Sequence, residues 1–103
     1  MKKTIDSKVY NTATATLIAS EDNGHYPNDF RYCLETLYRT QKGAFFLVGE
    51  GGPMSRYSVQ VGNSSTGGTD LVPVDDAEAL CWLEENDCQD EIDTYFSEQI
   101  EEA

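Results

Sequence analysis

The stretch FRYCLETLYRTQKGAFFLVGE constrains the fold of this chain more than any other segment. Aromatic and branched side chains dominate both of its halves, and such residues fit the half-buried surface of a strand. The segment QKG separates the halves, and Gly43 can take the positive φ that a short hairpin loop requires. The stretch therefore predicts an antiparallel hairpin whose strands span residues 31–40 and 44–49.

Weaker strand patterns follow this hairpin. YSVQV predicts a third short strand. LVPV predicts a strand at the edge of the sheet, where Pro73 is tolerated because no ladder N–H is needed there. Between these patterns, GNSSTGGTD contains three glycines and no large apolar side chain, so we predict a flexible loop.

The segment KVYNTATATLIAS, near the N-terminus, fits both a strand and a helix. Its threonines favour a strand. Alternatively, Asn11 or Thr12 caps a short helix, and Leu17 and Ile18 then lie on one side of it. We predict a short helix within residues 8–20, followed by a loop at EDNGHYPND, where Asn-Gly and Tyr-Pro interrupt regular structure.

Two amphipathic helices are predicted near the C-terminus. In the first, Asp75 and Glu78 have the spacing of a capping box. Its apolar residues fall on one side at about 100° per residue: Ala79, Leu80, Trp82 and Leu83. We therefore expect Trp82, the single tryptophan, to belong to the core rather than to a binding site.

The second helix follows a turn at NDCQD. Its apolar residues recur at the spacing of one helical face: Ile92, Tyr95, Phe96 and Ile100. The fold class predicted from these elements is α+β. A small antiparallel sheet of about three strands carries helices packed on it, including two acidic C-terminal helices. Residues 1–103 suffice for a single domain, and a hydrophobic content of 39% favours a folded chain over a disordered acidic tail.

The charge of the chain is unevenly distributed. Residues 1–56 contain seven basic and six acidic side chains, whereas residues 57–103 contain thirteen acids and no base. The formal net charge is −12, and Arg56 is the last positive side chain. This distribution opposes direct binding to nucleic acid or to an anionic membrane and suits a basic protein surface. Alternatively, the acids only keep a small protein soluble.

Helix energetics argue against solubility as the whole explanation. Glu98, Glu101 and Glu102 are expected in the last helical turns, where the helix dipole disfavours an anion by about 0.3–1 kcal/mol. Like-charge neighbours such as Glu98 and Glu102 add about 0.2–0.5 kcal/mol. A few lysines would relieve this repulsion without loss of solubility, and none is present after Arg56. Solubility alone is therefore a less adequate explanation of the acids than a basic partner.

Acidic helices can imitate the charge of DNA. Carboxylates three or four residues apart rise about 4.5–6 Å along a helix, and phosphates of one DNA strand advance about 3.4 Å per nucleotide. A basic cleft built for DNA would bind such a surface without reading a base. The predicted partner-binding residues are Asp75, Asp76, Glu78, Glu84, Glu85, Asp87, Asp90, Glu91, Asp93 and Glu98.

Little in the sequence indicates catalysis or a cofactor. His25 is the only histidine, and a nucleophilic pair with Cys33 is not expected, because reactive cysteines need an electropositive setting. Cys81 and Cys88 lack zinc-ligand spacing, and the glycine-rich segments lack the Gly-Lys-Ser/Thr ending of a phosphate-binding loop. We predict a protein that is not an enzyme and has no metal or other cofactor. Three unpatterned cysteines and the absence of a signal peptide or membrane span predict a cytosolic protein.

Part of the sequence resembles a known family. The segment DFRYCLETLYRTQKGAFFLVGEGGPMSRYSVQVGNSSTGGTDLVPVDDAEALCWLEE is similar to small acidic proteins of phages and mobile elements. The shared residues are Thr36 to Arg39, Gly43, Phe46 to Pro53, Tyr57, Gly62, Gly67, Gly68, Pro73, Glu78, Ala79, Trp82 and Glu84. The likeness to anti-CRISPR proteins implies an inhibitor in the bacterial cytoplasm that blocks the DNA-binding groove of a CRISPR surveillance complex. The resemblance carries no catalytic residue and no interaction motif.

The leading hypothesis is therefore an acidic DNA mimic, without enzymatic activity and favoured to be a monomer, that binds a basic CRISPR effector subunit. An alternative is an antitoxin-like or phage-assembly module that binds through its aromatic sheet face, with contacts from Phe46 and Tyr57. A third hypothesis is a carboxylate-dependent enzyme. It requires Glu35 and Glu50 to face each other in a cleft.

Overall fold

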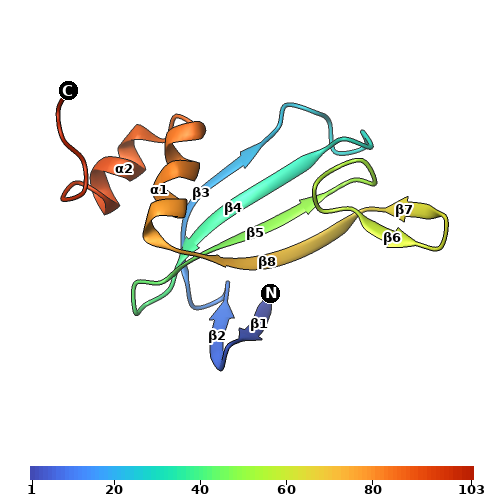
Figure 1. The fold of residues 1–103 in the computed structure, drawn as a ribbon, viewed down its shortest axis with the longest axis horizontal. Coiled ribbons are helices and arrows are strands. Elements are labelled where there is room, and N and C mark those ends of the chain that lie inside the picture. The colour runs from blue at the N-terminus through green and yellow to red at the C-terminus, as the bar shows by residue number, and fades with distance from the viewer.

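A computed structural model describes residues 1–103 and contains eight strands and two helices (Figure 1). In chain order they are β1 (Lys2–Ile5), β2 (Lys8–Asn11), β3 (Thr16–Asp22), β4 (Cys33–Arg39), β5 (Phe45–Gly51), β6 (Val59–Val61), β7 (Ser64–Thr66), β8 (Gly68–Val74), α1 (Asp76–Glu85) and α2 (Gln89–Tyr95). All strand pairs are antiparallel. The predicted α+β class is confirmed.

A four-stranded sheet with the order β3-β4-β5-β8 forms the centre of the molecule. The predicted hairpin is its middle pair, because β4 and β5 align from Cys33 opposite Gly51 to Arg39 opposite Phe45. Gly43, in the connecting turn, has φ of 91° as expected. The predicted edge strand is also confirmed, since β8 pairs only with β5.

The outer edge of β8 is protected against pairing with another strand. Residues two apart in a strand direct their backbone groups to the same side, so Leu71 and Pro73 share one edge. Pro73 has no N–H, and the N–H of Leu71 donates to the carboxylate of Asp70 at 2.9 Å. The outward edge of β8 therefore offers no free donor at these positions.

The two helices cover one face of the sheet at one end (Figure 1). The predicted capping box is present, because the Asp75 side chain accepts from the N–H of Glu78 at 2.7 Å and the Glu78 side chain accepts from the N–H of Asp75 at 3.1 Å. Ala79, Trp82 and Leu83 are buried, as the helical pattern predicted. They join a core cluster that also contains Ile18, Ala19, Leu37, Phe45, Cys88, Ile92 and Phe96.

The short helix predicted within residues 8–20 is wrong. This segment forms β2, a turn and β3, and β2 pairs with β1 as a separate hairpin on the other face of the sheet. The decisive contact is Tyr10, which packs edge-on against Phe46 with ring centroids 5.6 Å apart. Tyr10, Phe46 and Leu71 form a second buried cluster, so tertiary packing and threonine content favour strands over a local helix cap.

The second helix is shorter than predicted. α2 ends at Tyr95, and Ile100 lies beyond it and is exposed. Ile92 and Phe96 complete the buried contact, and the Phe96 ring stacks on Phe45 at 5.2 Å. Continuing the helix would add anions at its negative end without burying another apolar side chain, which gives no net stabilisation. The predicted dipole penalty at Glu98, Glu101 and Glu102 therefore does not apply.

The segment GNSSTGGTD is not a flexible loop. It contains β7 and the start of β8, and β7 pairs with β6 to form a small ribbon that projects from the sheet (Figure 1). Gly62 and Asn63 form a two-residue turn, and Gly62 has φ of 60°. Gly-Asn between two short strands is a hairpin signal that the glycine content obscured. The YSVQV strand is thus present, but it pairs outside the central sheet, and the strand count exceeds the predicted three.

Candidate protein-binding surface

The ten acids predicted to bind a partner lie at the helical end of the molecule. Asp75 is the N-cap residue of α1, four residues belong to α1, Asp87 lies in the turn and Glu98 follows α2. The remaining three, Asp90, Glu91 and Asp93, belong to α2. All are exposed except Glu91, which is half-buried. The apolar sides of both helices contact the sheet, so their carboxylates face solvent.

No acid after residue 74 forms an ion pair. The ion pairs of the molecule involve Asp29, Glu35 and Asp70, all of which precede the helices. Within the helices, carboxylates contact neutral donors. The thiol of Cys81 donates to Glu85 at 3.4 Å, and the amide of Gln89 donates to Asp93 at 2.9 Å. The negative charge of this region is therefore not compensated by the basic residues of the first half.

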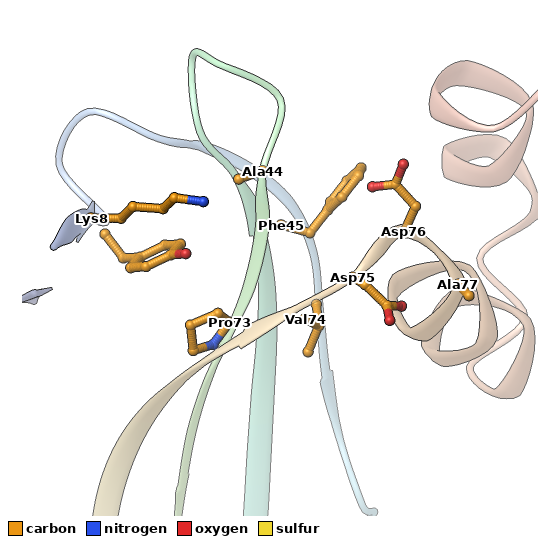
Figure 2. A pocket seen from close by; sticks show the side chains of 9 residues that line it. Lys8, Ala44, Phe45, Pro73, Val74, Asp75, Asp76 and Ala77 are labelled. Atoms are coloured by element: carbon orange, nitrogen blue, oxygen red, sulfur yellow. The ribbon is translucent and has the colours of Figure 1, made fainter. Parts of the chain in front are cut away.

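The predicted acids do not form a single row. Asp75 and Asp76 line a hollow of about 650 Å³ at the start of α1, together with Lys8 and Phe45. Figure 2 shows Lys8 on the N-terminal hairpin and the two aspartates where β8 meets α1, with Phe45 between Lys8 and the aspartates in this view. Lys8 forms no ion pair with either aspartate. At this hollow the acidic end of the molecule meets a basic residue.

Two other predicted acids border a groove between α1 and the edge strand β8. Glu78 and Glu85 are seven residues apart, so they lie on one side of the helix about 10.5 Å from each other along its axis. The groove has a volume of about 490 Å³, and we call it the α1–β8 groove. Its lining is Glu35, Leu47, Arg56, Tyr57, Asp70, Val72, Val74, Glu78, Cys81, Trp82 and Glu85. It thus combines four carboxylates with one arginine and an apolar floor.

Glu35 contacts residues from several parts of this groove. Its side chain is only 16% exposed, and its carboxylate accepts hydrogen bonds from the Tyr57 hydroxyl and from Trp82 Nε1, the latter at 3.3 Å. The Arg56 guanidinium lies 3.4 Å from the same carboxylate. Glu35 therefore connects β4, the loop before β6, and α1.

Strand alternation places Glu35 at this position. Glu35 and Leu37 point to the same face of β4, and Leu37 is fully buried beneath the helices. A glutamate that points to the buried face of a strand needs hydrogen-bond donors for its carboxylate, and Tyr57 and Trp82 supply them. The sequence hypothesis did not assign Glu35 to the binding surface. The signal that could have identified it is a carboxylate at an inward position of the most hydrophobic hairpin.

Tyr57 is fixed by a close approach to the backbone of β5. A Cβ at Gly49 would lie 1.8 Å from Tyr57 Cζ, so only glycine leaves room for this ring. Burial and the hydrogen bond to Glu35 raise the pKa of the Tyr57 hydroxyl well above its usual value. The hydroxyl therefore remains a donor to the carboxylate. Arg56 lies over the same ring, with its Cζ 5.7 Å from the centroid.

The other glycines of the GEGGP segment also permit close packing. A Cβ at Gly51 or Gly52 would lie 2.6 Å from the backbone oxygen of Tyr32 or Phe30, respectively. Gly68 similarly approaches the carbonyl oxygen of Tyr57. These glycines therefore hold the GEGGP segment against residues 30–32, and β8 against the loop that carries Tyr57.

The catalytic alternatives gain no support from the geometry. Glu35 lies opposite Gly49 and Glu50 lies opposite Leu34, so the two glutamates occupy opposite faces of the sheet. The His25 ring lies 3.8 Å from Asp29, and no hydrogen bond joins it to Cys33. Burial and the nearby Glu35 raise the pKa of the Cys33 thiol, which lowers its reactivity. No group of three or more His, Cys, Asp or Glu side chains is arranged to hold a metal ion.

The aromatic surface suggested as an alternative lies elsewhere. Phe46 is fully buried between Tyr10 and Tyr38, so it is unable to contact a partner. Exposed apolar side chains instead occur in the loops at the opposite end of the sheet: Tyr26, Phe30 and Met54 are 80%, 65% and 69% exposed. The N–H of Met54 donates to the carbonyl of Phe30 at 2.8 Å, so these two loops are joined.

Neither helix has the length and hydrophobicity that crossing a membrane demands. Comparison with known proteins adds no assignment to this geometry. No protein-family model, curated protein or solved structure matches the chain.

Proposed function

We propose that the chain is a non-enzymatic inhibitor that binds a basic, DNA-handling protein through its acidic C-terminal helices. One observation carries this proposal: the twelve carboxylates between Asp75 and Glu102 have no lysine or arginine partner. Charges that the fold leaves unpaired remain free to attract a positively charged surface. The family resemblance supports a subunit of a CRISPR surveillance complex as the target.

The dimensions of α1 support imitation of a phosphate backbone. Glu78 and Glu85 are separated by about 10.5 Å along the helix, which corresponds to about three nucleotide steps along one DNA strand. Glu84 and the acids of α2 extend the negative charge beyond this pair. A cleft shaped for DNA would therefore meet charges at a comparable spacing without base-specific contacts.

Competition with DNA tests the proposal. The target complex is incubated with a fluorescent duplex, and displacement by the inhibitor is followed by anisotropy. Replacing Glu84, Asp90 and Asp93 with the corresponding amides should weaken inhibition by about tenfold or more, because several complementary charges are removed. Raising the salt concentration should weaken the wild type in the same way.

A matched control distinguishes the effect of where the acids lie from the effect of lowering the total negative charge. Asp6, Asp22 and Glu50 are exposed, lie in the first half and form no ion pair, so their amide variants lose the same charge. The proposal expects near-normal inhibition from this control. Equal weakening by both variants, or unchanged inhibition by the folded helix variant, would contradict it.

A second candidate function is an interaction module that uses the opposite end of the sheet. The exposed Tyr26, Phe30 and Met54 favour it, since aromatic and methionine side chains are enriched at interfaces. Under this alternative, Phe30→Ser with Met54→Ser abolishes partner binding and the helix variants retain it. Gel filtration and circular dichroism of both variants distinguish lost binding from lost folding.

A further inference from the structure

The α1–β8 groove has the charge to receive a cation from outside. Glu35, Asp70, Glu78 and Glu85 line it, and Arg56 is its only positive residue. Asp70 is already paired with Lys3 at 3.0 Å, and Glu35 with Arg56 at 3.4 Å. Glu78 and Glu85 have no cationic partner, so the groove keeps an excess negative charge on its helical side.

The floor of the groove is suited to a long aliphatic stem. Leu47, Val72, Val74 and Trp82 line it, and Val72 is 42% exposed although it lies beside the helix. An arginine or lysine covers apolar surface with its methylene groups while its charged end stays among polar atoms. A duplex phosphate would instead be repelled here. The combination of apolar floor and acidic rims therefore fits a basic side chain.

Arg56 shows how a guanidinium is received in this groove. Its side chain is 71% exposed, yet its nitrogen lies 3.4 Å from Glu35 and its Cζ lies over the Tyr57 ring. Planar stacking on an aromatic ring with a carboxylate at the edge favours arginine over lysine. Because Arg56 is largely in solvent, it is able to leave or share this position when a second cation arrives.

We propose that the α1–β8 groove receives an arginine side chain of the basic partner, between Glu78 and Glu85 of α1 and the floor formed by β5 and β8. This proposal rests on the proposed function only in requiring that the partner be basic. It makes the groove the specific part of the contact, while the outward acids of α2 contribute long-range attraction.

The single tryptophan provides a direct measurement. Trp82 lines the groove and donates its indole N–H to Glu35, so its indole resonance is unique in the nitrogen-15 spectrum. The isolated chain is titrated with a short, terminally blocked glycine–serine peptide that contains two arginines. The control peptide has citrulline at both positions, which keeps the shape of the side chain and removes its charge. We expect a saturable shift of the indole resonance with the arginine peptide and none with citrulline.

Variants of the groove define the site. Glu78→Gln with Glu85→Gln should weaken arginine-peptide binding by about fivefold or more, as expected for the loss of two partly shielded ion pairs. The matched control is Asp22→Asn with Glu50→Gln, which removes the same charge from exposed, unpaired positions outside the groove and should change affinity less than about twofold. Arg56→Ala should strengthen binding by about two- to fivefold, because it removes the competing cation.

The outcomes separate this proposal from the proposed function. Equal weakening by the groove pair and by the Asp22 and Glu50 control overturns the groove as an arginine site. An indole resonance that does not shift with the arginine peptide overturns it as well. In the DNA-competition assay, full inhibition by the groove pair also overturns it and leaves the acidic-inhibitor proposal intact. Specific binding of the arginine peptide without any inhibition of DNA binding supports the groove and overturns the proposed function.

Discussion

The two parts of the chain treat their carboxylates in opposite ways. Before the helices, Asp29 lies 3.1 Å from Arg31, Glu35 lies 3.4 Å from Arg56 and Asp70 lies 3.0 Å from Lys3. Residues 75–103 contain twelve carboxylates and no such pair. In the first part, charge helps to fix loops and strands. In the second, apolar packing and hydrogen bonds such as that from Trp82 to Glu35 hold the helices on the sheet, so the charge of their own carboxylates is left for interactions outside the fold.

The largest expected effect comes from the apolar contact of the helical end. Phe96 is buried and stacks on Phe45, so Phe96→Ala should lower the free energy of unfolding by about 3–5 kcal/mol. Urea denaturation followed by circular dichroism measures the loss. Ile100→Ala is the control, because Ile100 lies beyond α2 and is exposed, and it should cost about 0.5 kcal/mol or less. Similar losses from both changes would show that the tail packs differently.

A smaller effect is expected where the loop meets the sheet. Gly49→Ala places a methyl group against the Tyr57 ring and should cost about 1–3 kcal/mol through overpacking. Chemical denaturation of the single variants and of Gly49→Ala with Tyr57→Ala completes a double-mutant cycle. The double variant should lose less than the sum of the single losses, because the ring no longer clashes with the methyl group. Strict additivity would argue against this contact.

Salt should have opposite effects on the stability contributions of the unpaired and the paired acids. It should reduce the repulsion between unpaired acids and weaken the attraction within ion pairs. Glu84→Gln with Glu98→Gln should leave stability unchanged or raise it by about 0.5 kcal/mol, because repulsion between like charges is reduced. Asp29→Asn should lower stability, since it removes the contact with Arg31. Thermal melts at about 0.01 M and about 1 M salt compare the two, because the Debye length falls from about 30 to about 3 Å. A stability loss in the glutamine variant would contradict uncompensated charge at the helical end.

The ion pair between Asp29 and Arg31 also predicts that stability depends on pH. Hydrogen bonds from the Arg31 side chain and backbone lower the pKa of Asp29 from 3.8 to about 2. A folded-state pKa below the unfolded value means that the ionised carboxylate favours the folded state. The stability advantage of wild type over Asp29→Asn should therefore be complete above about pH 3.8 and disappear as the pH falls towards 2. Melts over this range measure it, and a difference independent of pH would reject the assignment.

The smallest effect concerns Cys81, which lies on the rim of the α1–β8 groove. The hydrogen bond to Glu85 and its charge raise the pKa of this thiol. Glu85→Gln should lower that pKa, increase the thiolate fraction and speed alkylation by iodoacetamide about twofold, as read by mass spectrometry. Cys88 is buried with a pKa raised to about 11, so it serves as the slow reference within the same chain. Equal acceleration at both thiols would indicate general loosening.

Local patterns predicted much of the fold. The β4–β5 hairpin, the capping box at Asp75 and the inward face of α1 follow from residue type and spacing, and all are present. The segment of residues 8–20 was mispredicted because its strand character depends on Tyr10 reaching Phe46, a contact between residues far apart in the chain. The length of α2 was overestimated because periodicity at Ile100 did not reveal that Phe96 already completes the core.

The candidate site was predictable only in part. The exposure of the helix acids follows from amphipathic spacing. Their lack of ion pairs does not follow from the absence of bases after Arg56, because Asp70 lies in the same stretch and pairs with Lys3. The groove around Glu35 could not be predicted from the sequence, because it forms only where β4, the loop before β6 and α1 come together in the folded chain. Tyr57 and Trp82 are separated from Glu35 by 22 and 47 residues, and only the folded sheet brings their donors to one carboxylate.

The outer edge of β8 has a consequence for how copies of this protein interact at high concentration. A sheet rim lacking available amide hydrogens is a poor template for intermolecular β-pairing, the first step of ribbon-like aggregates. Pro73 and the Asp70 carboxylate confer that property on the part of the rim from Leu71 to Pro73. Crowded molecules would therefore pair less readily along this part of the rim.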